Sequence, residues 1–178
     1  VTPSYDDELS DNKTIVITKK DEKYGLLDNT GATILGNEYK SIKPISDKYE
    51  NGYIVQNESG KYGVINWNKT VAVDTKYDDV KQLYSNGNYY VVKENGKWKI
   101  VDTVGGSYLA GEYDDITAID GDYIVAKKSN KYGVVSILDS EVVVPLTYDL
   151  VVPASSKKYI VKTNGKYGVV DRENTKIL

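Results

Sequence analysis

The side chains that could carry chemistry in this sequence are carboxylates, lysines and tyrosines. The 178 residues include no Cys, no His, no Met and no Phe. A chain without thiolates and imidazoles lacks the usual transition-metal ligands, the serine–histidine and cysteine–histidine pairs of hydrolases, and histidine acid–base chemistry. Most enzyme templates are thereby excluded, and we expect neither a cofactor nor catalytic residues.

Carboxylates that lie close together in the sequence are candidates for calcium binding or for sugar hydrolysis. Asp120-Gly121-Asp122 follows Asp114-Asp115 and offers the oxygen ligands that calcium prefers, but it lacks the longer pattern of a calcium loop. Its Gly-Asp pair also fits an ordinary turn. Glycoside hydrolysis needs two carboxylates facing across a groove, whereas these acids recur as part of a repeated phrase. We predict no metal site and keep a carbohydrate-active enzyme as the least favoured hypothesis.

Nucleic acid and membranes are not expected partners. The net charge is −3, and all but one of the 23 cations are lysines, so no general nucleic-acid surface is indicated. Gly60-Lys61-Tyr62-Gly63 matches a Gly-x-x-Gly RNA clamp, but it falls inside a predicted hairpin without neighbouring helices. No apolar run approaches the roughly 18 residues of a membrane span, and no basic-then-apolar leader opens the chain. We expect a soluble mature segment without membrane insertion.

One phrase, lysine–aromatic–glycine followed by two aliphatic residues, recurs along the whole chain. Its copies are Lys23–Leu27, Lys61–Ile65, Lys97–Val101, Lys131–Val135 and Lys166–Val170. A Tyr-Asp-Asp phrase of varying completeness recurs with it, starting at Tyr5, Tyr39, Tyr77, Tyr113 and Tyr148. A β-branched run precedes each lysine phrase, at 15–17, 53–55, 90–92, 123–125 and 159–161. The sequence therefore predicts one repeat domain over residues 1–178, with units at about 5–38, 39–76, 77–112, 113–147 and 148–178.

Each unit has the features of a four-stranded antiparallel meander. Asn95-Gly96 and Asn164-Gly165 lie between β-branched segments, where they supply the positive φ of tight hairpin turns. The strands are apolar on both faces, and one unit of about 35 residues cannot cover both faces by itself. We therefore expect each sheet to stack on the sheets of its neighbours.

The glycine of the lysine phrase calls for a close neighbour, because glycine weakens a strand unless something approaches its backbone. We expect a side chain from a neighbouring unit at each of these glycines, which are Gly25, Gly63, Gly133 and Gly168. The tyrosine rows are expected to form the core between repeats. The lysines of the phrase and the Asp pairs are interpreted as solvated edges or ion pairs between units.

Apolar residues stand at the tips of several turns that follow the lysine phrase, where polar residues are usual. They are Trp67 in the second unit, Val104 in the third, and Ile137 with Leu138 in the fourth. Equivalent positions in stacked units lie side by side, so these residues would form one exposed patch of the kind that marks a partner surface. The alternative is that each tip folds over its own blade and is buried. Trp67 is the strongest single candidate, because Trp dominates interface hot spots and sugar stacking.

These phrases resemble the bacterial WG repeat, also called the KWG repeat. The resemblance rests on Lys97–Asp102 and Lys61–Ile65, each followed by a turn, an aliphatic pair and Tyr-Asp-Asp, and it covers essentially the whole chain. Tyr replaces the name-giving Trp in four units, and Lys99 replaces Gly in the unit that keeps the Trp. The resemblance implies a β-rich repeat structure, often in exported or surface proteins, and no catalytic residues that could be carried over.

Two all-β architectures fit five such units. A five-bladed β-propeller-like ring is favoured over an open β-solenoid, because the N-terminal Tyr-Asp-Asp strand would then complete the last blade and remove free edges. Against the ring, a repeat of about 35 residues is short for a propeller blade.

The function that we predict is a non-catalytic repeat module that presents a surface for binding a protein or a cell-envelope polymer. The alternative is a purely structural spacer or stalk within a larger exported protein. The absence of Cys fits export, and the Lys-, Asn- and Tyr-rich composition suggests a bacterial source, so we expect an extracellular or cell-surface location. The identity of the partner and the oligomeric state are left open.

Overall fold

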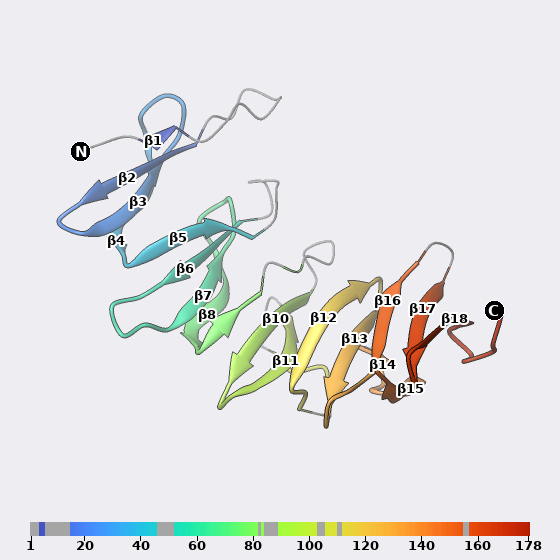
Figure 1. Ribbon diagram of the computed structural model, residues 1–178. Helices are drawn as coiled ribbons and strands as arrows, with labels where there is room; N and C mark the ends of the chain where they lie inside the picture. The colour runs from blue at the N-terminus through green and yellow to red at the C-terminus, as the bar shows by residue number, and fades with distance from the viewer. Residues whose placement is uncertain are drawn as a thin grey trace. The chain divides into compact units, whose positions relative to one another are not determined.

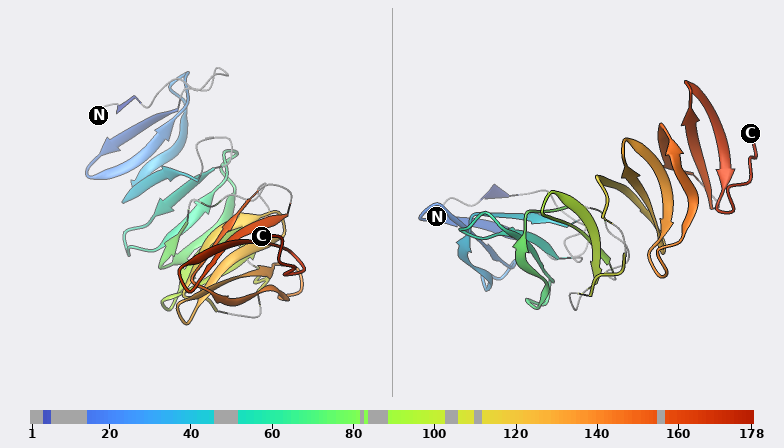
Figure 2. Two further views of the ribbon diagram at one scale, coloured as in Figure 1. Left: turned by 45° about the vertical axis from the view of Figure 1, so that its right-hand side comes forward. Right: turned by 90° about the horizontal axis from the view of Figure 1, so that it is seen from below.

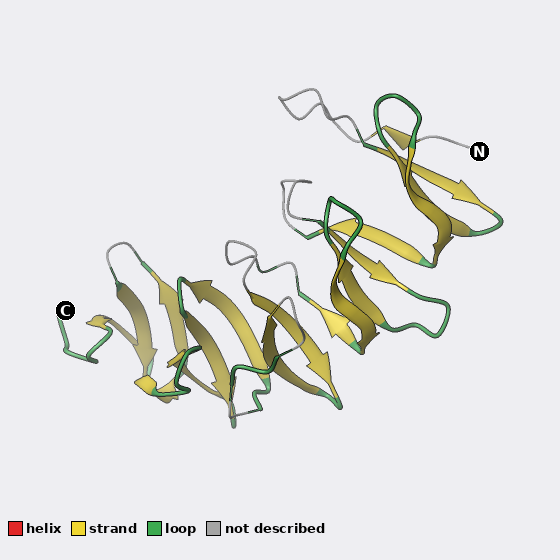
Figure 3. Ribbon diagram, turned by 180° about the vertical axis from the view of Figure 1, so that it is seen from behind, coloured by secondary structure: helices red, strands yellow, loops and turns green. Residues whose placement is uncertain are grey.

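A computed structural model describes residues 4–5, 15–45, 52–81, 83, 89–102, 106–109, 112–154 and 157–178. The regular elements of these residues are all strands (Figure 3), and they form five antiparallel sheets of three or four strands. The predicted all-β repeat fold is therefore confirmed. No helix in the described part of the chain has the length and apolarity of a membrane span. The chain divides into two compact parts, residues 1–82 and 83–178, which we describe separately.

The N-terminal part holds two complete four-stranded meanders (Figure 1). Repeat 1 consists of β1 (Ser4–Tyr5), β2 (Val16–Lys20), β3 (Lys23–Leu27) and β4 (Thr33–Tyr39). Repeat 2 consists of β5 (Ser41–Pro44), β6 (Tyr53–Gln56), β7 (Tyr62–Ile65) and β8 (Val71–Tyr77), and the short strand β9 (Asp79–Val80) follows it. In both repeats, strands that are consecutive in the chain are also neighbours in the sheet.

The C-terminal part continues the same pattern. The hairpin of β10 (Tyr89–Glu94) and β11 (Lys97–Asp102) belongs to repeat 3. Repeat 4 is β12 (Asp115–Asp120), β13 (Tyr123–Lys128), β14 (Lys131–Ser136) and β15 (Val142–Tyr148). Repeat 5 is β16 (Leu150–Pro153), β17 (Lys158–Thr163) and β18 (Lys166–Asp171). The sheet of repeat 5 lies beside that of repeat 4 in all three coloured views (Figures 1 and 2).

The central hairpins of repeats 3 and 5 turn where the Asn-Gly pairs of the sequence predict it. Asn95 and Gly96 have φ of 51° and 80°, and Asn164 and Gly165 have φ of 49° and 77°. Two successive residues with positive φ make the turn whose twist matches that of the two strands it joins. Glu94 and Lys97 therefore lie opposite each other across the hairpin of repeat 3.

The expectation that the glycine of the lysine phrase receives a side chain from a neighbouring repeat is wrong. At Gly25, Gly63 and Gly133 the neighbouring atoms belong to backbone of the same sheet. A Cβ at Gly133 would lie 2.5 Å from the carbonyl oxygen of Val144, and one at Gly63 would lie 2.6 Å from that of Val73. Val144 belongs to the last strand of the same sheet, and the register of that strand shifts beside the glycine. Gly25 meets the carbonyl of Leu35 in the same way, at 2.7 Å. The phrase thus encodes a β-bulge within the sheets of repeats 1, 2 and 4.

Repeat 3 shows what happens when the glycine is replaced. Lys99 stands at the glycine position, and its ammonium contacts the carboxylate of Glu94. The described residues after β11 form no continuous strand against it, only isolated bridges that join Trp98 to Tyr113 and Val101 to Ser107. A side chain at this position occupies the space that a bulged strand needs, which agrees with the isolated bridges that the described residues make to β11.

The core lies between sheets, as the two-faced apolar pattern requires. In repeat 4, Val125, Val134 and Val144 are at most 1% exposed and form one apolar cluster with residues of repeat 5. Those residues are Val151, Tyr159, Val161 and Val170. Corresponding clusters join repeat 1 to repeat 2 and repeat 3 to repeat 4. Stacking of neighbouring sheets is therefore observed within each part of the chain.

The strand that begins the chain pairs with the first sheet. Ser4 lies opposite Ile17, and Tyr5 lies opposite Val16. Completion of the last blade by this strand, and closure of a five-bladed ring, stay predictions from the sequence.

Candidate binding surface

Consecutive sheets are joined at the residue that follows the Tyr of each Tyr-Asp phrase. The Tyr is the last residue of one sheet, where it lies opposite the aromatic of the lysine phrase, as Tyr148 does with Tyr132. The next residue, Asp149, donates its backbone N–H to the carbonyl of Lys162 in the following sheet, at 2.7 Å. Asp114 does the same with Lys127, at 2.9 Å. The phrase is therefore the covalent and hydrogen-bonded link between two repeats.

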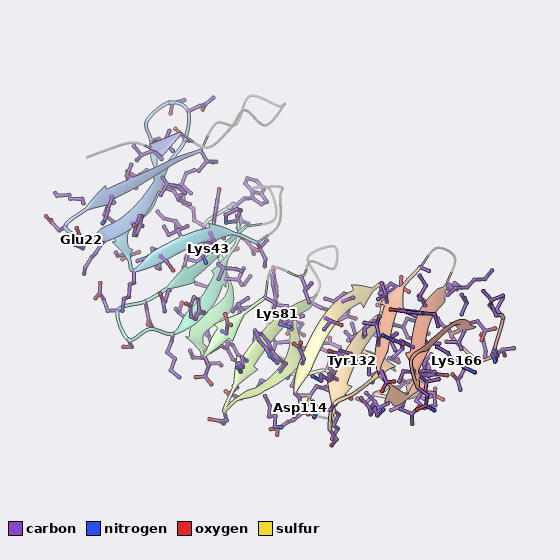
Figure 4. The ribbon with its side chains drawn as sticks, viewed as in Figure 1. Glu22, Lys43, Lys81, Asp114, Tyr132 and Lys166 are labelled. Atoms are coloured by element: carbon purple, nitrogen blue, oxygen red, sulfur yellow. The ribbon has the colours of Figure 1, made fainter. Side chains whose placement is uncertain are left out.

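The carboxylates of these links pair with the lysines of the phrase. Asp149 accepts from Lys131 at 2.5 Å, Asp114 from Lys97 at 2.5 Å, and Asp78 from Lys61 at 2.6 Å. Each pair joins the lysine of one repeat to the link residue that follows that repeat, and is partly exposed. Asp114 stands just before β12, where Figure 4 labels it.

The second oxygen of the link carboxylate binds the next repeat. Asp114 Oδ2 accepts the backbone N–H of Ser129 at 2.7 Å, and Asp149 Oδ2 accepts that of Asn164 at 3.0 Å. Both carboxylate oxygens thus bind the backbone of the hairpin turn in the following sheet. The hydrogen bond from Lys97 holds the pKa of Asp114 below its ordinary value, and Lys131 lowers the pKa of Asp149 in the same way. These acids are thus used in joining repeats, as the ion-pair interpretation of the sequence expected.

The candidate surface lies at the turn after the lysine phrase, whose backbone is held by short polar side chains. In repeat 2, Asn66 donates its N–H to the carbonyl of Thr70 at 2.8 Å, and Asn68 Oδ1 accepts from the backbone N–H and the hydroxyl of Thr70. Lys69 takes a φ of 71° and reaches the carbonyl of Thr33 in repeat 1, at 2.8 Å. The turn is therefore fixed to its own strands and to the preceding repeat.

Trp67 projects from this fixed turn into solvent. Its side chain is 58% exposed, and Val71, on the strand that leaves the turn, is 59% exposed. Trp67 thus has the accessibility that a binding residue requires, and the alternative in which this tip is buried does not hold for it.

The turn of repeat 4 is one residue longer than the turn of repeat 2. As a result, one of its two apolar residues is buried and the other is exposed. Ser136 donates its N–H to Glu141, five residues on, whereas the turn of repeat 2 spans four residues. The inserted residue, Ile137, is completely buried, and its N–H binds the carbonyl of Asp122 at 2.7 Å. The expectation of an exposed Ile137 is therefore wrong, because the extra residue points into the core. Leu138 takes the tip position and is 61% exposed.

Further apolar residues are exposed near the tip of repeat 4. Val142, which follows the turn, is 45% exposed and corresponds to Val71 in repeat 2. The hydroxyl of Ser140 approaches the carbonyl of Tyr108 at 3.4 Å, and Tyr108 is 39% exposed. Val104, the remaining predicted tip residue, lies outside the described residues.

The tip of repeat 5 carries a charged residue that the apolar pattern of the sequence does not indicate. Arg172 holds in repeat 5 the position that Trp67 holds in repeat 2, two residues before the positive-φ residue that ends the turn. Its guanidinium binds Asp120 of repeat 4 at 2.8 Å and lies over the ring of Tyr123, 4.0 Å from the ring centre. Counting from the lysine phrase reaches this position, because Trp67 lies six residues after Lys61 and Arg172 lies six residues after Lys166. A search for apolar tip residues passes over it, because the residue there is charged.

Asp120 is held within this cluster by two side chains of repeat 5. Its Oδ2 accepts from Arg172 and also from the hydroxyl of Tyr159, at 2.9 Å. Burial raises the pKa of Tyr159 to about 12. No group of three acidic side chains among the described residues is arranged to hold a metal ion.

The repeat pattern places the chain in a known family. A family model described as "WG containing repeat" matches residues 62–98, 101–132 and 138–167, more than half of the chain. The chain belongs to the WG-repeat family. The model matches three segments, so it does not by itself establish five WG copies. No curated protein matches the chain.

The WG repeats of this chain share their fold with β-propellers. Hsv2 of Kluyveromyces lactis, with its loop 6CD replaced by a Gly-Ser linker, is 10% identical with a TM-score of 0.53 over 92% of this chain. A second Hsv2 structure from the same organism is 8% identical with a TM-score of 0.53 over 94%. This chain spans 61% and 60% of the length of those two chains. At this identity the likeness concerns the fold alone.

Proposed function

We propose that this WG-repeat chain is a non-catalytic module that binds a protein or a cell-envelope polymer through its turn tips. The observation that carries the proposal is the exposure of Trp67 on a turn whose backbone is fixed by hydrogen bonds at both ends. An aromatic side chain held out on a rigid support loses little conformational entropy on binding, which is why such residues dominate interfaces. An extracellular or cell-surface location in a bacterium belongs to the same proposal.

The polar surroundings of Trp67 support a partner with hydroxyl or amide groups. Asn66, Asn68 and Thr70 share its turn, and their side chains satisfy one another. An aromatic face beside amides and hydroxyls can stack on a sugar ring or pack on a protein side chain while hydrogen bonds form around it. The hypothesis of a structural spacer predicts no ligand for this surface.

The test is binding of the purified chain to cell-envelope fractions and to a panel of purified envelope glycans. Trp67→Ala is compared with the wild-type chain, and Ile177→Ala is the matched control, because Ile177 is also an exposed apolar residue but lies after the last strand of repeat 5. We expect saturable binding that Trp67→Ala weakens at least about tenfold, the loss typical of a hot-spot residue, and that Ile177→Ala leaves unchanged. Absence of binding by the wild-type chain would favour the spacer, and equal binding by all three would place the surface elsewhere.

A further inference from the structure

The outer face of the last sheet is apolar and exposed. Ile160 of β17 and Val152 of β16 lie opposite each other and are 39% and 41% exposed. Val169 of β18 lies on the other side of Ile160, and Tyr167 on the same face is 64% exposed. The opposite face of this sheet, which includes Tyr159 and Val161, is buried against repeat 4. A single sheet thus has one covered and one uncovered apolar face.

The same positions are buried in the repeats that precede it. Counting back from the hairpin turn, Ile160 corresponds to Val125 in repeat 4 and to Val91 in repeat 3, which are 1% and 0% exposed. Val169 corresponds by the same register to Val134, Ile100 and Leu26, which are at most 1% exposed. The carbonyl of Leu178 lies against Gly168 as that of Val144 lies against Gly133, so Leu178 completes the face.

What covers this face in the earlier repeats is always the same kind of surface. The clusters between repeats 3 and 4 and between repeats 4 and 5 show the following sheet contributing one apolar residue from its first strand, two from alternate positions of its second strand, and one from its third. In repeat 5 these residues are Val151, Tyr159, Val161 and Val170, and in repeat 4 they are Ile116, Ile124, Ala126 and Val135.

We infer that the outer face of β16–β18 is a docking site for the inner face of a further sheet with this WG-repeat pattern. The partner is defined by its chemistry, an apolar-x-apolar pair on the middle strand flanked by one aliphatic residue on each side. Buried apolar area of this kind is the main stabilising contribution in stacked repeats.

The first sheet of the chain itself is a poorer match. At the positions of Tyr159 and Val161 it carries Val16 and Thr18. Thr18 is polar, and its hydroxyl and carbonyl accept hydrogen bonds from Asn37 Nδ2 at 3.0 and 3.1 Å. Docking of this face on Ile160 would set a hydrogen-bonded polar pair where repeats 2 and 5 place Val55 and Val161.

The test extends the whole chain by one repeat. Residues 145–178 are duplicated after Leu178, which keeps the phase because Leu178 corresponds to Val144. We expect hydrogen exchange of the β17 and β18 amides to slow at least about tenfold in the extended chain. The same extension carrying Val161→Lys within the added copy controls for added length, because that lysine cannot enter the interface.

A substitution on the docking face gives the decisive comparison. In the chain without extension, Ile160→Lys is expected to change the unfolding equilibrium constant less than about threefold, as exposed positions do. In the extended chain it is expected to raise that constant at least about tenfold, because the lysine would then be buried. Thr163→Lys, at the exposed hairpin tip of the same strand, is the charge control for both chains.

Two results would overturn the inference. A small effect of Ile160→Lys in both chains would mean that the added sheet does not dock there. A large effect in both would mean that the face is already covered in the chain as it stands. Sedimentation velocity over a range of concentrations would then separate a second copy from the first sheet of the same chain.

Discussion

Gly133 lies so close to the carbonyl of Val144 that a Cβ added at Gly133 would be 2.5 Å from that oxygen. The two residues belong to neighbouring strands of one sheet, at the point where the register of β15 shifts. The same approach recurs at Gly25, Gly63 and Gly168. The glycine of the lysine phrase therefore leaves the space that a bulged neighbouring strand needs within the same sheet.

Replacement of this glycine should destabilise the chain. We expect Gly133→Ala to lower the free energy of unfolding by about 1–3 kcal/mol, because backbone must move to relieve the contact. Gly36→Ala is the matched control, since nothing lies within 4 Å of a Cβ there, and it should be neutral or stabilise by up to about 1 kcal/mol. Urea unfolding followed by tyrosine fluorescence measures both. Equal effects of the two substitutions would contradict the bulge explanation.

The bulge glycines are recognisable in the sequence, but their neighbour is backbone of the same sheet and not the side chain of another repeat that the sequence suggests. A glycine in a strand indicates only that something approaches the backbone. Whether the neighbour is a side chain from another repeat or backbone from the same sheet depends on strand register, which composition and spacing do not determine. Lys99 is consistent with the bulge explanation. The repeat in which it replaces the glycine has no continuous last strand among its described residues.

The tip residues show a second limit of prediction from sequence. Trp67 and Leu138 are exposed as expected, but Ile137 is buried. The difference arises from a one-residue insertion. The spacing from the lysine phrase to the next Tyr shows it, since it is 17 residues from Lys131 to Tyr148 and 16 from Lys61 to Tyr77, but the spacing does not say which residue is the inserted one. The repeat period, the strands and the hairpin turns were predictable because apolar alternation and Asn-Gly pairs report local geometry.

Two adjacent residues of the repeat 4 turn should respond in opposite ways to truncation. We expect Ile137→Ala to cost about 2–5 kcal/mol, because it leaves a cavity in a fully packed cluster. Leu138→Ala should change the free energy of unfolding by less than about 0.5 kcal/mol, because its side chain is exposed. Chemical unfolding of the two variants checks the prediction, and a cost for Leu138→Ala equal to that of Ile137→Ala would contradict the turn geometry.

The link carboxylates should make stability depend on pH in the acid range. Lys131, and then the N–H of Asn164, hold the pKa of Asp149 below its ordinary value. A carboxyl whose pKa is lowered on folding stabilises the fold above its unfolded pKa of about 3.9, and this contribution disappears as the pH falls through the folded pKa. We therefore expect Asp149→Asn to be less stable than the wild-type chain at neutral pH, with a difference that begins to shrink as the pH falls below about 4 and disappears once the pH is below the folded pKa.

Urea unfolding of both chains between pH 7 and pH 2 measures this difference. Lys131→Met is the matched control, because it removes the main cause of the lowered pKa while leaving the carboxyl in place. In the Lys131→Met background, the effect of Asp149→Asn at neutral pH should be smaller. A difference between Asp149→Asn and wild type that persisted at pH 2 would assign the effect to packing and not to charge.

The Arg172 cluster should tie repeat 5 to repeat 4 through the geometry of the guanidinium and not through charge alone. Its fork binds Asp120 Oδ2 at 2.8 Å while its plane covers the ring of Tyr123. Arg172→Ala should cost about 1–3 kcal/mol, the range for hydrogen bonds to charged groups that are partly buried. Arg172→Lys should recover less than half of this loss, because an ammonium cannot bind in two directions and stack on a ring at once. Hydrogen exchange would locate the effect, since β16–β18 should lose protection before β12–β15; full recovery by lysine would show that charge alone holds the two repeats together.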